Sequence, residues 1–363
     1  MRLGGKRTWI TLAVLLLLLA GAAYWAGLHV WGSYHYRAAE QALERRDFPE
    51  AAGHLKKCLD ASPSDLTWRL AAAQTARRQG EYNEALEHLA AYQQEGGSAE
   101  ALARERKLVE AQRGDQALID QLLTSCEQRP EALETPAALE TAIEGFRNVL
   151  RAAAGAKPPP QYLARLRRAA DLWLRLRTGP ADQAQGLVWR ADFLKRADDR
   201  RAAVADLRRA VELDPQHFEA RLELATLVAP EDPREAADHL EALRRRHPDD
   251  NRARFLLALV RRSLGQPDEA RQLLDEVLAS EPGHAGALLA RGQLALDAQQ
   301  PAEAERWLRR AWTLEPEEPE TNLALSDCLK MAGQADEAKT FEDRFLRIKA
   351  QRARKATDPT HRD

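Results

Sequence analysis

An alanine that recurs at every thirty-fourth position is the strongest constraint on the fold of this chain. Ala236, Ala270, Ala304 and Ala338 keep the spacing. Ala51 and Ala85 keep the same spacing, and so do Ala203 and Ala237. Pro248, Pro282 and Pro316 repeat in phase with the first set of alanines. A fixed period of this length is typical of helical hairpins that stack into a solenoid, where each unit buries its apolar face against its neighbours. The period therefore predicts a repeat array and favours a binding protein over an enzyme.

The composition agrees with an all-α protein. Aromatic residues make up 6% of the 363 residues, and runs rich in Val, Ile and Thr that would predict strands are missing. The 54 basic and 56 acidic residues leave a formal net charge of −2, so no global positive field points to nucleic acid as a partner.

The three cysteines indicate no cofactor or disulfide framework. Cys58, Cys126 and Cys328 lie far apart and form no CxxC pair, and each is surrounded by apolar helical residues. We expect them to be small buried hydrophobic side chains. No zinc-protease, P-loop or dinucleotide motif is present, so the chain is expected to be non-catalytic and to bind no cofactor or metal. His54 and His88 are one period apart, which suggests either a metal pair or, as the simpler interpretation, two exposed positions on second helices.

The segment 184–215 shows how one unit is built. A first helix over 185–197 has Leu187, Ala191 and Leu194 on one face, and a polar turn follows at 198–200. A second helix over 201–212 ends before Pro215, which cannot continue it. The small residues allow the two helices to approach closely.

These units resemble tetratricopeptide repeats, in which small residues occupy positions 8, 20 and 27, glycine position 15 and proline position 32. The resemblance predicts an all-α, right-handed solenoid of helix–turn–helix repeats in two blocks, 32–133 and 184–352. Repeat 218–250 is one residue short, and repeat 100–133 is degenerate. The pattern is specific for the fold but not for a function.

The period breaks between residues 134 and 183. Two helices, over 136–153 and 162–177, are joined by the sequence GAKPPPQ at 155–161, whose prolines favour a polyproline II loop. We interpret this segment as an irregular hairpin; the alternative is a boundary between two repeat blocks.

The N-terminal sequence predicts a membrane anchor. Residues 8–31 contain no Lys, Arg, Asp or Glu and follow a short basic flank at 1–7, so they are expected to form a transmembrane signal-anchor helix that contacts the membrane. This places the N-terminus in the cytoplasm and the repeats outside it. A cleaved signal peptide with export is the alternative, because Ala20, Gly21 and Ala22 form a small-residue cleavage pattern.

At the other end, the basic segment from Arg344 to Lys355 is expected to cap the solenoid. Contact of this segment with nucleic acid or anionic lipid is the weaker interpretation. Residues 353–363 are expected to form a disordered tail.

The resemblance also implies a partner-binding groove. In this family the concave surface is lined by first-helix positions 2, 5, 9, 12 and 13, and the partner is a protein or extended peptide. Carried over, these positions include Gln74, Arg77, Arg78, Asp192, Lys195, Arg196, Arg252, Phe255, Arg262, Gln293 and Lys330. Six of them, at positions 12 or 13, are basic, which suggests an acidic segment or a peptide carboxylate as ligand; the alternative is that these charges only solvate the face.

The leading hypothesis is therefore a membrane-anchored scaffold that binds a protein in its groove, in the assembly or quality control of an envelope complex. The second hypothesis is a non-catalytic regulator that recruits an enzyme to the cytoplasmic face of the membrane. The third, an enzyme with its site in 134–183, lacks a nucleophile–base pattern to support it.

Overall fold

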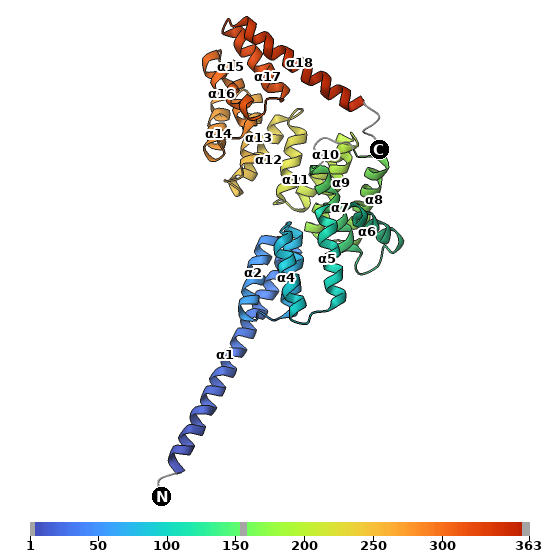
Figure 1. The fold of residues 1–363 in the computed structure, drawn as a ribbon, viewed down its shortest axis with the longest axis vertical. Helices are drawn as coiled ribbons and strands as arrows, with labels where there is room; N and C mark the ends of the chain where they lie inside the picture. Colours follow the sequence, from blue (N-terminus) through green and yellow to red (C-terminus); the bar gives the residue numbers. More distant parts are fainter. Residues whose placement is uncertain (1–3, 153–157, 358–363) are drawn as a thin grey trace. The chain divides into compact units, whose positions relative to one another are not determined.

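The computed structural model describes residues 4–152 and 158–357, with side chains for 15–21, 27, 30–152 and 158–354. Within these residues every regular element is an α-helix, eighteen in all (Figure 1). Contacts divide the chain into unit 1, Met1–Asp199, and unit 2, Arg200–Asp363. The predicted all-α array of helical hairpins is confirmed.

Unit 1 contains nine helices, and consecutive helices pack against each other along the chain. They are α1 (Gly4–Glu44), α2 (Phe48–Ala61), α3 (Leu66–Gln79), α4 (Tyr82–Gln94), α5 (Ala99–Arg113), α6 (Gln116–Gln128), α7 (Thr135–Ala152), α8 (Pro160–Leu176) and α9 (Pro180–Arg196).

Unit 2 contains the other nine, ordered in the same way. They are α10 (Arg200–Leu213), α11 (Phe218–Val228), α12 (Pro233–Arg246), α13 (Asn251–Ser263), α14 (Pro267–Ser280), α15 (Ala285–Asp297), α16 (Pro301–Leu314), α17 (Pro319–Met331) and α18 (Ala335–Thr357). Units 1 and 2 are divided between α9 and α10, inside the helical hairpin that the sequence predicts over 184–215.

The predicted membrane anchor is wrong. Helix α1 runs unbroken through residues 8–31, and no helix among the residues with described side chains is long and apolar enough to cross a bilayer. The signal-anchor helix predicted over 8–31 is therefore not supported. The single-pass location predicted from it, with a cytoplasmic N-terminus and the repeats outside, is overturned with it.

The second half of α1 belongs to the repeat array instead. Ala39 and Ala42 are fully buried, and the backbone of Gly32 lies so close to the ring of Trp68 that an added Cβ would be 2.4 Å from it. This part of α1 therefore acts as the first helix of a hairpin whose second helix is α2.

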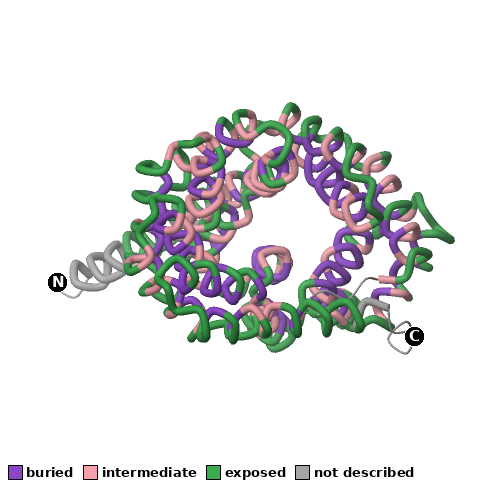
Figure 2. Tube along the Cα trace, turned by 90° about the horizontal axis from the view of Figure 1, so that it is seen from above, coloured by how far each residue is buried: buried purple, intermediate pink, exposed green. Residues whose placement is uncertain are grey.

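The periodic alanines mark the tightest packing between paired helices. Ala236, Ala270, Ala304 and Ala338 are each 0% exposed. Along each helix, buried and exposed residues form separate faces, as Figure 2 shows. The three cysteines are free and buried, which confirms their predicted role as small hydrophobic side chains.

A left-handed residue recurs in the turn between the two helices of a repeat. Gly80, Gly114, Gly265 and Gly333 occupy repeat position 15 with φ between 73° and 111°. Arg46, Asp198 and Gln299 occupy the same position in other repeats with φ near 60°. An L side chain in this conformation costs about 1–2 kcal/mol, so the turn geometry explains the glycine of the repeat pattern.

Helices α7 and α8 form the irregular hairpin near the ranges predicted from sequence. Trp173 of α8 is 1% exposed and packs edge-on against Trp189 of α9, with ring centroids 5.1 Å apart. Helix α7 lies close to α5, because a Cβ at Gly145 would be 2.2 Å from the carbonyl oxygen of Ala111. Residues 153–157, which include 155–157 of the predicted loop, lie outside the described residues, as do 1–3 of the flank and 358–363 of the tail.

Candidate partner-binding surface

In unit 1, the predicted groove residues of α3 contact α5 and α7. Arg77 is 3% exposed, and its Nη1 donates to Gln112 Oε1 and to Thr141 Oγ1 at 2.8 Å each. Gln74 Nε2 donates to Glu105 Oε1 at 2.9 Å. Arg78 donates to Glu140 Oε1 of α7 at 3.1 and 3.2 Å.

Glu140 is the centre of a buried ion network. It is 6% exposed and accepts from Arg46 Nη2 at 2.5 Å as well as from Arg78. Arg46 also donates to Asp182 of α9 at 3.1 Å. Burial alone would raise the pKa of Glu140, but Arg46, Arg78 and Arg77 outweigh it and lower that pKa to about 2. The carboxylate is thus ionised inside the unit and ties α7 to α3 and to the α1–α2 turn.

The predicted residues of α9 also form contacts within unit 1. Asp192 lies 3.2 Å from Arg196 Nε, 3.7 Å from Lys195 Nζ and 3.5 Å from Arg147 Nε. The basic side chains predicted for this block are therefore engaged by carboxylates of the same unit.

In unit 2, the predicted residues lie on α13, α15 and α17, and their charges are also paired. Arg262 donates to Gln293 Oε1 at 2.5 Å and to Asp297 Oδ2 at 2.8 Å. Lys330 Nζ lies 2.8 Å from Glu342 Oε2 of α18. The first set of contacts joins α13 to α15, and the second joins α17 to α18.

The N-terminal ends of α11 and α13 present aromatic rings with a cation beside them. Arg252 donates to Asp250 Oδ2 at 2.9 Å, and its guanidinium lies 5.0 Å from the centroid of the Phe218 ring. Phe255 packs against His284 with centroids 4.8 Å apart. Gly286 leaves room for this ring, since a Cβ there would be 3.0 Å from Phe255 Cζ.

Sequence reasoning missed an apolar series in which Phe255 is one member. The fifth position of four successive repeats holds a large apolar residue that is half-buried or exposed: Leu222, Phe255, Leu289 and Leu323. We call these four the apolar ladder. Leu323 is 38% exposed, and Leu259 and Leu296 are half-buried at two other groove positions. The signal that could have found this series is the spacing of one repeat between neighbouring members, which is visible in the sequence.

A second recurring contact ties four of the first helices to the turn before them. The fourth residue of the helix donates to the carbonyl of a proline six residues earlier. The pairs are Arg69 with Pro63, Arg221 with Pro215, Arg254 with Pro248 and Asn322 with Pro316. The bond gives the proline carbonyl of the turn a hydrogen-bond donor.

The two histidines considered as a metal pair form different contacts. His54 Nδ1 lies 2.9 Å from Nδ1 of His35 in α1, and His88 Nε2 lies 3.7 Å from Glu84 Oε1. No group of three or more His, Cys, Asp or Glu side chains in the described part of the chain is arranged to hold a metal ion.

Comparison with solved structures finds similar repeat proteins. MamA of Desulfovibrio magneticus RS-1 is 17% identical over 47% of this chain and 97% of that chain, with a TM-score of 0.41. PilF of Pseudomonas aeruginosa is 20% identical over 47% and 78%, with a TM-score of 0.42. TTC0263, a TPR protein of Thermus thermophilus, is 22% identical over 47% and 97%, with a TM-score of 0.40. A search of curated proteins finds no match.

Three family models described as tetratricopeptide repeats match the sequence. One matches 42–108 and 295–355, a second matches 226–285 and 260–319, and a third matches 184–217. Together these ranges cover more than half of the chain and carry the hairpins, buried alanines and position-15 turns described above. The chain therefore belongs to the tetratricopeptide repeat family.

Proposed function

We propose that this protein is a binding scaffold that holds a segment of a protein partner against the apolar ladder of unit 2. The observation that carries the proposal is the ladder itself. Four large apolar side chains keep one repeat position across α11, α13, α15 and α17, yet none of them is fully buried. Partially exposed apolar groups arranged in a row are typical of a protein-binding surface.

The charges around the ladder define the chemistry of the partner. Arg262 is neutralised by Asp297, and Lys330 by Glu342. A partner therefore gains most of its binding free energy from apolar side chains that cover the ladder. The paired charges at its edge supply polar contacts and favour one register. An amphipathic segment with large apolar residues on one side fits this description.

Unit 1 supports the assignment to unit 2. Its equivalent first-helix arginines are already engaged by a segment of the same chain, since Glu140 of α7 accepts from Arg78, and Thr141 accepts from Arg77. A partner at these residues would first have to displace α7, whereas all four ladder residues keep part of their side chain exposed.

The proposal is tested with peptides selected from a random library on the immobilised full chain and then titrated in solution. Phe255→Ala removes the one aromatic ring of the ladder and is expected to weaken binding at least about tenfold, which corresponds to about 1.4 kcal/mol. Leu314→Ala is the matched control, because Leu314 is 49% exposed at the end of a second helix.

Circular dichroism checks that both variants remain folded. Equal loss of affinity in the two variants, or none in Phe255→Ala, would contradict the assignment of the partner to the ladder.

A further inference from the structure

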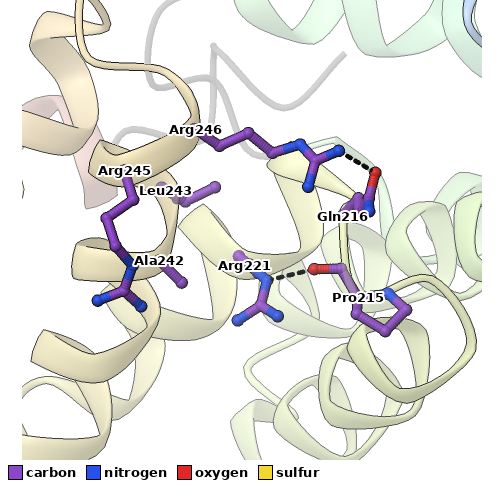
Figure 3. A pocket seen from close by; sticks show the side chains of 7 residues that line it. All are labelled: Pro215, Gln216, Arg221, Ala242, Leu243, Arg245 and Arg246. Carbon is purple, nitrogen blue, oxygen red and sulfur yellow. Dashed lines mark hydrogen bonds between the residues drawn. The ribbon is translucent and has the colours of Figure 1, made fainter.

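Unit 2 contains a cavity of about 340 Å³ that lies apart from the ladder residues (Figure 3). Pro215 and Gln216 of the α10–α11 turn form one side, and Arg221 of α11 projects into it. The last two turns of α12 form the other side with Ala242, Leu243, Arg245 and Arg246. Three of the seven lining side chains are arginines, and none is acidic.

The three guanidinium groups have few partners. Arg221 Nε donates to the carbonyl of Pro215 at 2.6 Å, and its Nη1 lies 3.4 Å from Nδ1 of His239. Arg246 donates to the side-chain amide of Gln216. Arg245 has no hydrogen bond or ion pair with any described residue. All three arginines therefore keep donors available, and none forms an ion pair with a carboxylate in the described part of unit 2.

In two other repeats with an arginine at this place, a carboxylate accompanies it. Arg69 and Arg254 hold the same place as Arg221, four residues after the helix N-cap. Arg69 pairs with Glu95 at 3.4 Å, and Arg254 pairs with Glu276 at 3.3 Å.

Counting from the buried alanine of each repeat locates the missing acids. Glu276 lies six residues after Ala270, and the residue six after Ala236 is Ala242. Glu95 lies ten residues after Ala85, and the residue ten after Ala236 is Arg246. Both positions line the cavity. In this repeat one acid is thus replaced by a small neutral residue and the other by a third positive charge.

The result is an excess of positive charge that the fold does not require. Basic residues in the last turn of α12 suit the negative end of its dipole, but Arg221 comes from a different helix. Burial and the charge of Arg245 both lower the pKa of Arg221, and the opposing charge of Asp214 does not outweigh them. An anion in the cavity would remove this repulsion.

We propose that this cavity binds a phosphate group, with Arg221, Arg245 and Arg246 as its ligands. Guanidinium groups bind phosphate oxygens through paired N–H donors, and three of them suit an anion that carries two or more negative charges. The phosphate takes the place of the carboxylates that Glu95 and Glu276 supply to the matching arginines of other repeats.

Isothermal titration of the full chain with pyrophosphate at low ionic strength tests the proposal. Inorganic phosphate and phosphoserine, in separate titrations, distinguish a free anion from a phosphorylated side chain as the source.

Ala242→Glu is the decisive variant because it restores the acid of the neighbouring repeat beside Arg221. It should keep the fold and reduce pyrophosphate affinity at least about tenfold. Arg221→Gln should reduce it similarly, whereas Arg306→Gln, an exposed arginine of unit 2 outside the cavity, should leave it unchanged.

Binding by the wild type that is lost in Ala242→Glu and kept in Arg306→Gln supports the site. No binding of any of the three anions to the wild type at 10 mM would overturn it. So would equal affinity of the wild type and Ala242→Glu, or equal loss in Arg306→Gln. The peptide titrations that test the ladder use other residues, so the two proposals can fail separately.

Discussion

Replacing Glu140 by glutamine should destabilise unit 1 strongly. The change keeps the shape of the side chain but removes the charge that lies between Arg46 and Arg78, both within hydrogen-bond distance. Arg46 would keep Asp182, whereas Arg78 would keep only a neutral amide and its contact with the ring of Phe48, 4.5 Å away.

Two independent arguments give the same size of effect. The pKa of Glu140 falls from 4.5 to about 2 on folding. At about 1.4 kcal/mol per unit, this amounts to about 3 kcal/mol of stability at neutral pH. Removing one partner of a buried ion pair typically costs about 3–5 kcal/mol, because the remaining charge stays buried without compensation. We therefore expect a loss of at least about 3 kcal/mol.

Hydrogen exchange measured by mass spectrometry across a urea series isolates unit 1 from unit 2. Peptides from α7 report on unit 1, and peptides from α13 serve as an internal control. With a urea dependence of up to about 3 kcal/mol per molar, the unfolding midpoint of α7 should fall by about 1 M or more, with α13 unchanged. Glu131→Gln is the matched control, since Glu131 is exposed in the turn before α7 and should change stability by less than about 0.5 kcal/mol. A midpoint in Glu140→Gln that equals that of Glu131→Gln would refute the reasoning.

Three further predictions concern pH, the turns and the thiols. Because the pKa of Glu140 is lowered on folding, the stability that its carboxylate contributes is fully present above about pH 4.5 and is lost as the pH falls toward 2. Arg78→Gln should therefore shift the acid unfolding of unit 1, followed by circular dichroism, to higher pH values. Gln299→Gly should raise the stability of unit 2 by about 1 kcal/mol and Gly265→Ala should lower it by a similar amount, because both turns have positive φ; urea denaturation checks the opposite signs. Burial raises the pKa of Cys58 and Cys126 to about 11, and Cys328 is also buried. None of the three thiols should therefore react with Ellman's reagent at pH 8 until the protein unfolds. Prompt labelling of the native chain would contradict the packing.

The fold could be predicted from local pattern because repeat packing is a local property. The residue pattern that places Ala236 or Ala270 against a paired helix lies within a single repeat. The turn at position 15 likewise requires a positive φ, which favours glycine there. The contacts that bind α7 to the first helices of unit 1 were not predictable in this way. Glu140 meets Arg46 and Arg78 across 94 and 62 residues, and no period relates them.

The site was predicted only in part for a related reason. The resemblance places the candidate groove on the first helices and includes Phe255, but it does not predict that arginines such as Arg77 and Arg262 are engaged by side chains of the same chain. Conversely, the apolar ladder and the bond from the fourth helical residue to the proline carbonyl both keep the repeat period, so a comparison of equivalent positions would have found them. The predicted anchor is wrong: a run without charged residues does not by itself make a membrane span, and the described residues contain no helix that is long and apolar enough to cross a bilayer.

Photocrosslinking from the ladder tests the central claim most directly. A benzophenone side chain is placed at Leu289 in one variant of the full chain and at Leu314 in another, and each is irradiated with a library-selected peptide. We predict a crosslinked product from position 289 that excess unlabelled peptide abolishes, with none from position 314. Crosslinking from position 314 alone, or equally from both positions, would contradict the claim that the first-helix ladder of unit 2 holds the partner.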